Sequence, residues 1–355
     1  MLQAYALVHY LQSLGHKAAV IDYWPQYMPK YKVDFKWVPS KYDYPGIRNL
    51  YRCLKRPHRL SEQARHDSFE SFFSRYIPIT STSYSSIEQL RQAPPDADIY
   101  IAGSDQIWNT TFQNGNDPAF YLSFGQPGRK ISYAASFATT SLKEGTQGFV
   151  QAQLKNFDAI SVREQSGLEI LDKLGYSGVV VVDPVFLLTI NQWDELLSAE
   201  STEDEQYILV YDFEPRKGLI ANIAKRLAAL MNCKIYSVSP FMSRYADKSF
   251  VNCTPNTFVS LIKKARCVIS NSFHGTAFSM LYNRDFFVVN RKDGLNVRMR
   301  DLLTRYGLSD RLVSMSVGNE LLMSEIDYGQ VDVQLNSDID FSKSFLLNQI
   351  ELANG

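Results

Sequence analysis

One histidine stands where a parallel α/β fold would hold a ligand. From Cys267 to Val289 the chain passes through an apolar run, a Ser-Asn-Ser turn, His274-Gly275, an amphipathic segment and a second apolar run. This order predicts strand, turn, helix and strand, with His274 and Gly275 at the helix N-terminus. Parallel sheets bind ligands at that end of their strands, where helix N-termini also present free N–H groups. Since the chain has only five His, His274 is the leading candidate for a functional residue; the alternative is a buried His bonded to backbone.

The expected surroundings of His274 suit proton transfer. A helix N-terminus disfavours the imidazolium ion, whereas a bound anion favours it. A His that becomes protonated only when an anionic substrate is present would serve as a general acid.

Arginines near strand ends would supply positive charge. Arg163 follows an apolar run, and a guanidinium there is costly unless it meets a carboxylate or phosphate. A salt bridge with Glu164 or a neighbouring acid would equally satisfy it. Of Arg298 and Arg300, we expect Arg298 to reach a ligand. Arg291–Lys292 are expected in a surface turn.

A second polar turn, Gly103-Ser104-Asp105, follows the apolar run 98–102. Its Asp could accept hydrogen bonds from sugar hydroxyls, or it could cap a following helix. Asp183, after another apolar run, is interpreted as a strand end. The sequence has no Walker A loop, GxGxxG, HExxH or GxSxG, and no metal-ligand cluster, so we expect no metal.

Apolar runs supply the elements that must position these residues. In the first half we predict a helix over 1–15 and strands over 17–23, 98–102, 130–135, 159–162 and 179–182. The last four end in small or polar residues, which is typical of parallel strands that share one carboxyl edge. Residues 24–95 show no clear period and are predicted to be irregular, with the basic segment 51–59 a solvated helix or loop rather than a phosphate site.

The pattern breaks at about 190–205 and then restarts. We predict strands over 207–211 and 234–238 and on both sides of His274, and helices over 218–231, 255–266 and 297–306, the second capped by Thr254. The chain is thus expected to form two α/β domains, 1–190 and 205–330, facing across a cleft, with a helical tail over 331–355. The first helix lacks a capping side chain and a preceding strand, so we expect a strand and its loop upstream of residue 1.

The composition bounds the function. With 355 residues, 45% hydrophobic and 21% charged, the chain suits two folded domains. Its 37 basic and 37 acidic residues give no argument for nucleic acid. No apolar run approaches the ~20 residues that cross a bilayer, which leaves peripheral association with a membrane open. Four Cys without a pairing motif predict free thiols and a cytoplasmic protein.

Five motifs together resemble the polysaccharide pyruvyl transferase family. In chain order they are Gly103-Ser-Asp-Gln-Ile-Trp-Asn109, Ser132-Tyr-Ala-Ala-Ser-Phe137, Ser161-Val-Arg-Glu164, Val182-Asp-Pro184 and Ser270-Asn-Ser-Phe-His-Gly275. The resemblance runs from residue 2 to about 345. It implies a fold similar to GT-B glycosyltransferases, with two Rossmann-like domains across a cleft. It also implies transfer of pyruvate from phosphoenolpyruvate onto two hydroxyls of a sugar in a polysaccharide precursor, giving a cyclic ketal.

The resemblance also implies roles for individual residues. His274 and Arg163 would contact phosphoenolpyruvate, with His274 the acid that protonates its methylene. The residues expected to bind substrate are Gly103, Ser104, Asp105, Ser272, Gly275, Thr276 and Arg298. Phosphoenolpyruvate is the donor substrate, no cofactor is required, and the acceptor is a glycan or lipid-linked saccharide. Residues 24–95 and 241–245 are expected to wall the acceptor site.

Two other functions remain open from the sequence. One is a GT-B-type glycosyltransferase that uses a nucleotide sugar, with His274 and the arginines on the diphosphate. The other is a catalytically inactive relative that binds a sugar or an anion.

Overall fold

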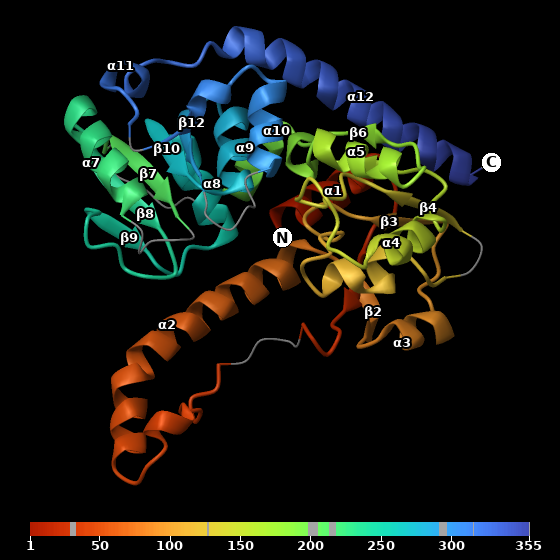
Figure 1. The fold of residues 1–355 in the computed structure, drawn as a ribbon, viewed down its shortest axis with the longest axis horizontal. Coiled ribbons are helices and arrows are strands. Elements are labelled where there is room, and N and C mark those ends of the chain that lie inside the picture. The colour runs from red at the N-terminus through yellow and green to blue at the C-terminus, as the bar shows by residue number, and fades with distance from the viewer. Residues whose placement is uncertain are drawn as a thin grey trace.

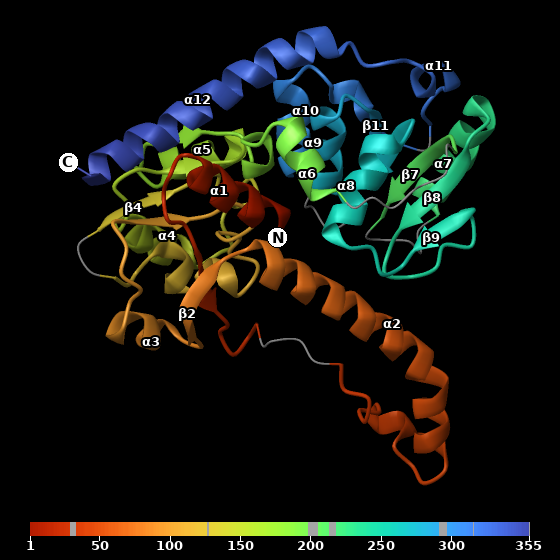
Figure 2. The same cartoon turned by 180° about the vertical axis from the view of Figure 1, so that it is seen from behind.

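Two α/β domains lie side by side, joined by a long C-terminal helix across their tops in Figure 1 and seen from behind in Figure 2. The structure is a computed structural model. It describes residues 1–28, 33–125, 128–197, 205–212, 218–290, 297–314 and 316–354. The predicted surface turn at Arg291–Lys292 and most of the predicted acidic break, residues 198–204, lie outside the described residues.

The second domain is built on a six-stranded parallel sheet in the described part of the chain. Its strands are β7 (Tyr207–Tyr211), β8 (Lys234–Val238), β9 (Lys248–Phe250), β10 (Cys267–Ser270), β11 (Asp285–Val289) and β12 (Leu312–Val313). Their spatial order is β12-β11-β10-β7-β8-β9, and every pairing is parallel. The strand order therefore reverses between β7 and β10, which makes the ends of these two strands the switch point where open sheets hold ligands.

Helices cover both faces of this sheet. They are α7 (Leu219–Met231), α8 (Pro255–Lys264), α9 (Phe273–Leu281), α10 (Val297–Arg305) and the short η5 (Ser309–Arg311) and α11 (Asn319–Leu322). The central strand β7 is apolar along its length because both its faces are covered, and Ile208, Leu209 and Val210 are fully buried. As predicted, Thr254 caps α8 by accepting a hydrogen bond from the Thr257 N–H.

The first domain carries shorter parallel strands. They are β1 (Val20–Tyr23), β2 (Ile79–Tyr84), β3 (Ile99–Ala102), β4 (Arg129–Ser132), β5 (Ser161–Val162) and β6 (Val179–Val180). The pairs β1–β2, β3–β4 and β5–β6 are parallel. Isolated bridges from Ile131 to Ala159 and from Ala135 to Val162 connect β4 to the β5 region. The carboxyl ends of β3, β4, β5 and β6 thus share one edge, as predicted.

Helices of the first domain follow the predicted pattern in part. They are α1 (Leu2–Ser13), α3 (Ile87–Gln92), α4 (Gln147–Leu154), α5 (Gln165–Lys173) and the short η2 (Asn114–Asn116), η3 (Pro118–Tyr121) and η4 (Pro184–Phe186). The predicted first helix is confirmed, and Gly15 follows it with φ +89°, a conformation that glycine adopts without strain.

The expectation that 24–95 would be irregular is wrong. This stretch contains η1 (Ser40–Tyr42), the 30-residue helix α2 (Ile47–Tyr76), β2 and α3. The helix escaped detection because it is mostly solvated and has only Arg59 and Phe72 buried, so its apolar residues do not mark a core face. The prediction for segment 51–59 is confirmed, since it forms part of this mostly exposed helix.

Two helices cross between the domains. The short helix α6 (Ile190–Leu196) stands where the sequence predicted a break, and it packs on the second domain: Trp193 lies 4.8 Å from Phe278 ring to ring, and Asp194 pairs with Lys263 at 2.8 Å. The tail helix α12 (Tyr328–Asn354) returns to the first domain, where Ser342 Oγ accepts a hydrogen bond from the Val182 N–H at 3.0 Å. These contacts hold the facing edges of both sheets together.

Candidate active site at the domain junction

The turn that carries His274 is shaped by its neighbours. Ser272 is the N-cap of α9 and accepts the Gly275 N–H, while its own N–H donates to Ser270 Oγ at 3.0 Å. A Cβ at Gly275 would lie 2.5 Å from Ser270 Oγ and 3.3 Å from Tyr211 Cδ1, so only glycine lets the helix approach β7 and β10 this closely. His274 is therefore fixed in the first turn of α9, beside unpaired helix N–H groups.

This turn sits at the switch point of the second sheet. The side chain of Asn271, directly after β10, donates to Asp212 Oδ1 at 2.7 Å, and Asp212 follows β7. This hydrogen bond ties the ends of the two strands at which the order reverses. His274 thus lies at the position that the sequence predicted and that doubly wound sheets use for ligands.

Arg163 faces the same place from the first domain. It follows β5, its side chain is 1% exposed, and its Nη1 donates to Asp183 Oδ2 at 2.6 Å. Ser104 Oγ donates to the same carboxylate oxygen at 2.9 Å. Of the alternatives left open by the sequence, a salt bridge with a neighbouring acid is formed, and the acid is Asp183 rather than Glu164, whose Oε2 is 3.8 Å from Arg163 Nε.

His274 and Arg163 converge on Asp183. His274 Nε2 is 3.9 Å from Asp183 Oδ1, and the His274 side chain retains 23% exposure. The guanidinium of Arg163 also lies 4.2 Å from the ring centre of Phe273, the residue before His274, a distance suited to a cation–π contact. The two residues that the sequence proposed for one site are thus brought together by one buried carboxylate and one aromatic ring.

Arg298 completes the group from α10. Its Nη1 donates to Asp105 Oδ1 at 3.2 Å, and the same oxygen is 3.5 Å from Arg163 Nη2. The Arg298 guanidinium lies 5.9 Å from the ring centre of Phe273. Asp105 has φ +82°, a region that non-glycine residues rarely adopt and that clusters at functional sites. No helix begins at Asp105 in the described residues 102–113, so its carboxylate serves the arginines rather than a helix cap.

Several buried polar atoms of this group have no hydrogen-bond partner within the described part of the chain. They are Arg163 Nε and Nη2, Arg298 Nε, His274 Nε2 and Glu164 Oε2. Buried donors are almost always satisfied in folded proteins, so an unpaired set gathered at one point requires an explanation. Four of these five atoms belong to cationic or protonatable groups, and an anion placed among them would accept their hydrogen bonds.

Burial and neighbouring charges shift the pKa values of the cluster in opposing directions. Burial alone would raise the pKa of Asp105 and of Asp183, but Arg163 and His274 hold both carboxyl pKa values below their usual range. Burial lowers the pKa of His274, helped by Arg163 and opposed by Asp183 and Asp105. Burial and the neighbouring Arg163 lower the pKa of Arg298 to about 10. The two arginines thus remain charged at neutral pH while the imidazole is neutral.

The other residues predicted to bind substrate differ in how closely they are connected to the cluster. Ser104 is part of it. The hydroxyl of Thr276, 1% exposed, donates to the Ser272 carbonyl at 3.1 Å, so both residues serve the start of α9 in this structure. Gly103 has no heavy atom within 4 Å of the place where a Cβ would stand, so its backbone is not forced into close approach to any described residue.

Sequence reasoning missed two members of the site and gave a third another role. Asp183, interpreted from the sequence as a strand end, is the shared partner of Arg163, Ser104 and His274. Phe273, whose ring lies beside both Arg163 and Arg298, is not among the predicted site residues. Glu164 accepts from Ser136 Oγ at 2.6 Å and from the Ala138 N–H at 3.0 Å, which braces the loop after β4. For Asp183 and Glu164, the signal available in the sequence was that each follows an apolar run that predicts a strand.

A cavity of about 300 Å³ adjoins the cluster between α5, α10 and α12. Arg163, Asp183 and Phe273 contribute to its wall, whereas His274 and Arg298 do not. The cavity therefore reaches the Arg163–Asp183 pair without including His274 or Arg298 in its wall.

Solved structures of similar fold were found, with bound molecules that include UDP, UDP-GlcNAc and quercetin. S. aureus MnaA with UDP has a TM-score of 0.47 at 15% identity over 81% of this chain and 85% of that chain. A UDP-GlcNAc 2-epimerase from Neisseria meningitidis bound to UDP-GlcNAc has a TM-score of 0.42 at 11% identity over 74% and 78%. UGT89C1 from Arabidopsis thaliana with quercetin has a TM-score of 0.43 at 10% identity over 100% and 95%. At these values we draw no functional argument from the likeness.

Comparison with curated proteins finds no match. The family model described as polysaccharide pyruvyl transferase matches residues 1–293, which is most of the chain and includes every residue of the cluster except Arg298. The fold agrees with the expectation of two Rossmann-like domains. The chain therefore belongs to the polysaccharide pyruvyl transferase family and is a pyruvyltransferase.

Proposed function

We propose that this protein transfers pyruvate from phosphoenolpyruvate to two hydroxyls of a saccharide in a polysaccharide precursor and forms a cyclic ketal. The observation that carries the proposal is the set of unpaired donors on Arg163, Arg298 and His274, contributed by both domains to one point. Phosphoenolpyruvate has a phosphate and a carboxylate, and planar guanidinium groups bind such oxygens in pairs of hydrogen bonds.

Donor binding would rearrange the carboxylates of the site. Asp183 is fully buried and remains with Arg163, which it holds in position. Asp105 differs because its side chain is 43% exposed, although it lies 3.2 Å from Arg298 and 3.5 Å from Arg163. An incoming phosphate or carboxylate would replace Asp105 on these arginines. The displaced carboxylate would then be available to accept a hydrogen bond from an acceptor hydroxyl.

His274 supplies the proton in this scheme. Its Nε2–H protonates the methylene carbon of the enol, and the electron-poor C2 is attacked by a first sugar hydroxyl, which loses its proton. The C2–O bond to phosphate then breaks, and the second hydroxyl attacks C2 and closes the ketal. One of the two protons lost by the hydroxyls returns to His274, and the other leaves with phosphate. A well-placed acid of this kind contributes about 10²- to 10⁴-fold in rate.

The pKa of His274 fits a proton that is taken up together with the donor. Burial and Arg163 lower the pKa of His274 and keep the imidazole neutral before the donor binds. A bound phosphoenolpyruvate brings negative charge near Nε2 and raises this pKa, so the acid forms when its substrate is present. The carboxylate of Asp183, 3.9 Å from Nε2, also favours the protonated ring.

The donor and the ketal are tested together. Purified protein is incubated with phosphoenolpyruvate and a panel of free and lipid-linked glycosides, with products followed by mass spectrometry and phosphate release. We expect the mass gain of a pyruvyl ketal and equimolar phosphate, both lost in His274→Gln and retained in His58→Gln, a solvated His on α2.

A thermal-shift experiment separates the proposed donor from a nucleotide sugar. Phosphoenolpyruvate should raise the melting temperature, and the rise should disappear in Arg298→Gln. Stabilisation by UDP-sugars without any by phosphoenolpyruvate would instead assign the cluster to a diphosphate. Free Cys53, Cys233, Cys253 and Cys267 are in keeping with the cytoplasmic site of action that we propose.

A further inference from the structure

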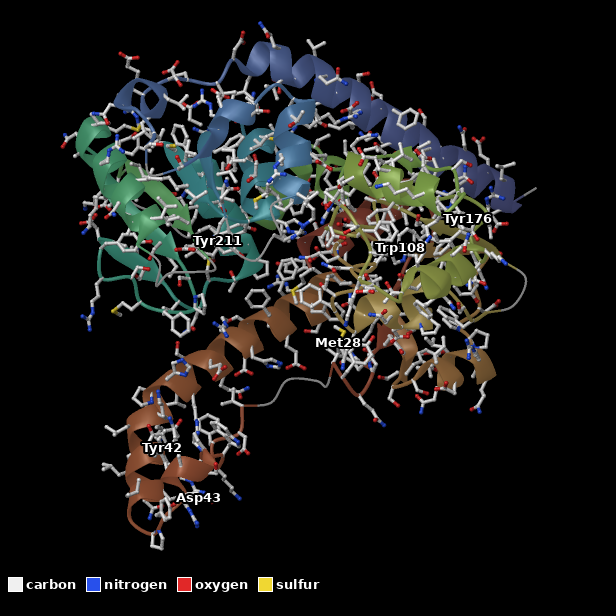
Figure 3. The ribbon with its side chains drawn as sticks, viewed as in Figure 1. Met28, Tyr42, Asp43, Trp108, Tyr176 and Tyr211 are labelled. Atoms are coloured by element: carbon white, nitrogen blue, oxygen red, sulfur yellow. The ribbon has the colours of Figure 1, made fainter. Side chains whose placement is uncertain are left out.

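An arm built from residues 33–60 projects from the body of the molecule. It consists of the segment 33–46 and the first half of α2, which run side by side. Arg59 Nη1 donates to the Phe35 carbonyl at 2.6 Å, and Arg52 Nη2 donates to the Lys36 carbonyl at 2.8 Å. Figure 3 shows Tyr42 and Asp43 at the far end of this arm, well away from both domains.

The middle of α2 contacts the second domain, and its N-terminal half extends away from both domains. Ser61 Oγ is 3.1 Å from Asn252 Oδ1 in the second domain, and the ring of His58 is 6.0 Å from that of Phe241. From this contact toward its N-terminus, α2 extends past both domains in Figures 1 and 2. Pro57, which cannot donate to the helix ladder, lies within this half of α2.

The free half of α2 exposes an apolar row. Ile47, Leu50 and Leu54 are 49%, 60% and 71% exposed. Their i, i+3, i+7 spacing places them on one face of the helix, roughly opposite the face from which Arg52 and Arg59 reach the 33–46 segment. Trp37 and Tyr44 are each 58% exposed as well. A monomeric soluble surface rarely gathers so many large apolar side chains in one projection.

The same arm is strongly basic. Residues 33–60 hold seven Lys or Arg and two Asp, a net charge of +5, in a chain whose total is +0. Lys41, Lys55 and Arg56 are exposed. The rest of the molecule therefore carries a compensating negative charge, and the positive field is concentrated on the projection.

We infer that this arm docks the enzyme on the surface of a bilayer that contains anionic lipid. An exposed apolar row, interfacial Trp and Tyr and a basic surround are together what inserts shallowly among lipid headgroups. Among the described residues no helix has the length and apolarity to cross a bilayer, so docking is peripheral. The inference goes beyond the proposed chemistry and does not depend on it.

The positive charge of the arm favours an anionic bilayer over a second copy of this chain as its binding partner. Two arms placed face to face would bring +5 against +5, whereas anionic headgroups neutralise the charge and the acyl boundary accepts Leu50 and Leu54. A nucleic acid would satisfy the charge but would leave the apolar row in water.

Vesicle co-sedimentation tests the inference with the full-length protein. The probes are phosphatidylcholine vesicles and vesicles containing about one-third phosphatidylglycerol. We expect binding to the second kind alone, weakened by added salt. Lys41→Gln/Lys55→Gln/Arg56→Gln should reduce partitioning about a hundredfold, from about fivefold per charge. Leu50→Gln/Leu54→Gln should reduce it at least tenfold. Neither variant touches a buried side chain.

Matched controls lie elsewhere on the surface. Lys155→Gln/Lys173→Gln/Lys225→Gln removes three exposed charges, and Val333→Gln/Leu352→Gln removes two apolar side chains on α12 that are 74% and 62% exposed. Both controls should bind vesicles as the parent does. A polarity-sensitive dye on exposed Cys53, with Cys53→Ser as blank, should report a less polar environment on anionic vesicles.

Three outcomes would overturn the inference. One is failure to bind anionic vesicles; another is equal loss in the control variants; the third is a dye response to protein concentration or to duplex DNA without vesicles. Because no assay here uses phosphoenolpyruvate, absent vesicle binding with intact pyruvyl transfer would remove this inference alone.

Discussion

Replacing Arg163 by Gln should destabilise the protein through the carboxylate that it leaves behind. Arg163 and Asp183 are 1% and 0% exposed, and Nη1 to Oδ2 is 2.6 Å. After the change, Asp183 retains only Ser104 Oγ and the Val185 N–H as close donors among the described residues. Breaking a buried pair from one side costs about 3–5 kcal/mol, and we expect that loss in the free energy of unfolding at pH 7.

The opposite substitution, Asp183→Asn, should cost less. It leaves Arg163 with Asp105 at 3.5 Å and Glu164 at 3.8 Å, so the guanidinium keeps two acidic neighbours. In the double variant, Asn and Gln are both neutral and no buried charge is uncompensated. We therefore expect the double variant to be more stable than Arg163→Gln alone, with a coupling energy of about 2 kcal/mol or more.

The pH dependence gives this prediction a second readout. In the parent, Arg163 and His274 hold the Asp183 pKa below its unfolded value despite burial. This contribution is present above the unfolded pKa of about 3.9 and is lost as pH falls through the folded pKa. Without Arg163, burial raises the Asp183 pKa, so the variant gains relative stability as pH falls. The difference in free energy of unfolding between the parent and Arg163→Gln should therefore become smaller from pH 7 toward pH 5.

Urea unfolding at several pH values measures these quantities, with Lys263→Gln as control. That substitution also removes a cation from a carboxylate, Asp194 at 2.8 Å, but both side chains are about one-third exposed, so the cost should be at most about 1 kcal/mol. A loss in Arg163→Gln no larger than in Lys263→Gln, or a double variant no better than Arg163→Gln, would refute the reasoning.

Three further predictions concern the second domain. Gly275→Ala should cost about 1–3 kcal/mol in urea unfolding, because its Cβ would meet Ser270 Oγ at 2.5 Å; a neutral result would show that the turn relaxes freely. Thr254→Ala should cost about 1 kcal/mol by uncapping α8 and leave turnover unchanged, so lost turnover would contradict a purely structural cap. The lowered pKa of His274 predicts that kcat/KM for phosphoenolpyruvate, which reports the free enzyme, rises as pH falls below 6.5. The value of kcat, which reports the enzyme with donor bound, should stay high to a higher pH because the bound anion raises the pKa of His274. Identical pH profiles for kcat/KM and kcat would count against protonation that is linked to anion binding.

Local sequence was a good guide to the second domain. Its strands and helices have strong periods, bounded by a clear cap at Thr254 and a polar turn at Ser272, and the predicted elements agree with β7, β8, α8, β10 and α9 to within a few residues. The reason is that these strands are buried on both faces, which forces continuous apolar runs. The first domain has two-residue strands such as β5 and β6, and these carry less of a pattern.

The arm escaped the same method for a physical reason. Periodicity reports a helix that buries one face against a core, whereas the first half of α2 buries only Arg59. Its apolar residues, Leu50 and Leu54 among them, face water. The very property that hid this helix from a core-based pattern is the one that suggests a surface partner.

By itself the sequence determined the types of chemistry available and the strand ends at which they occur: a His and a Gly after β10, an Arg after β5, an acid after β3. Each follows from local periodicity and turn composition. Only the tertiary structure decided that Asp183 is shared by Arg163 and His274. Arg163, 20 positions from Asp183, meets it because β5 pairs with β6, whereas His274, 91 positions away, reaches it only when the second domain packs against the first. Pairing across two domains depends on their docking through α6 and α12, and no local pattern records that geometry.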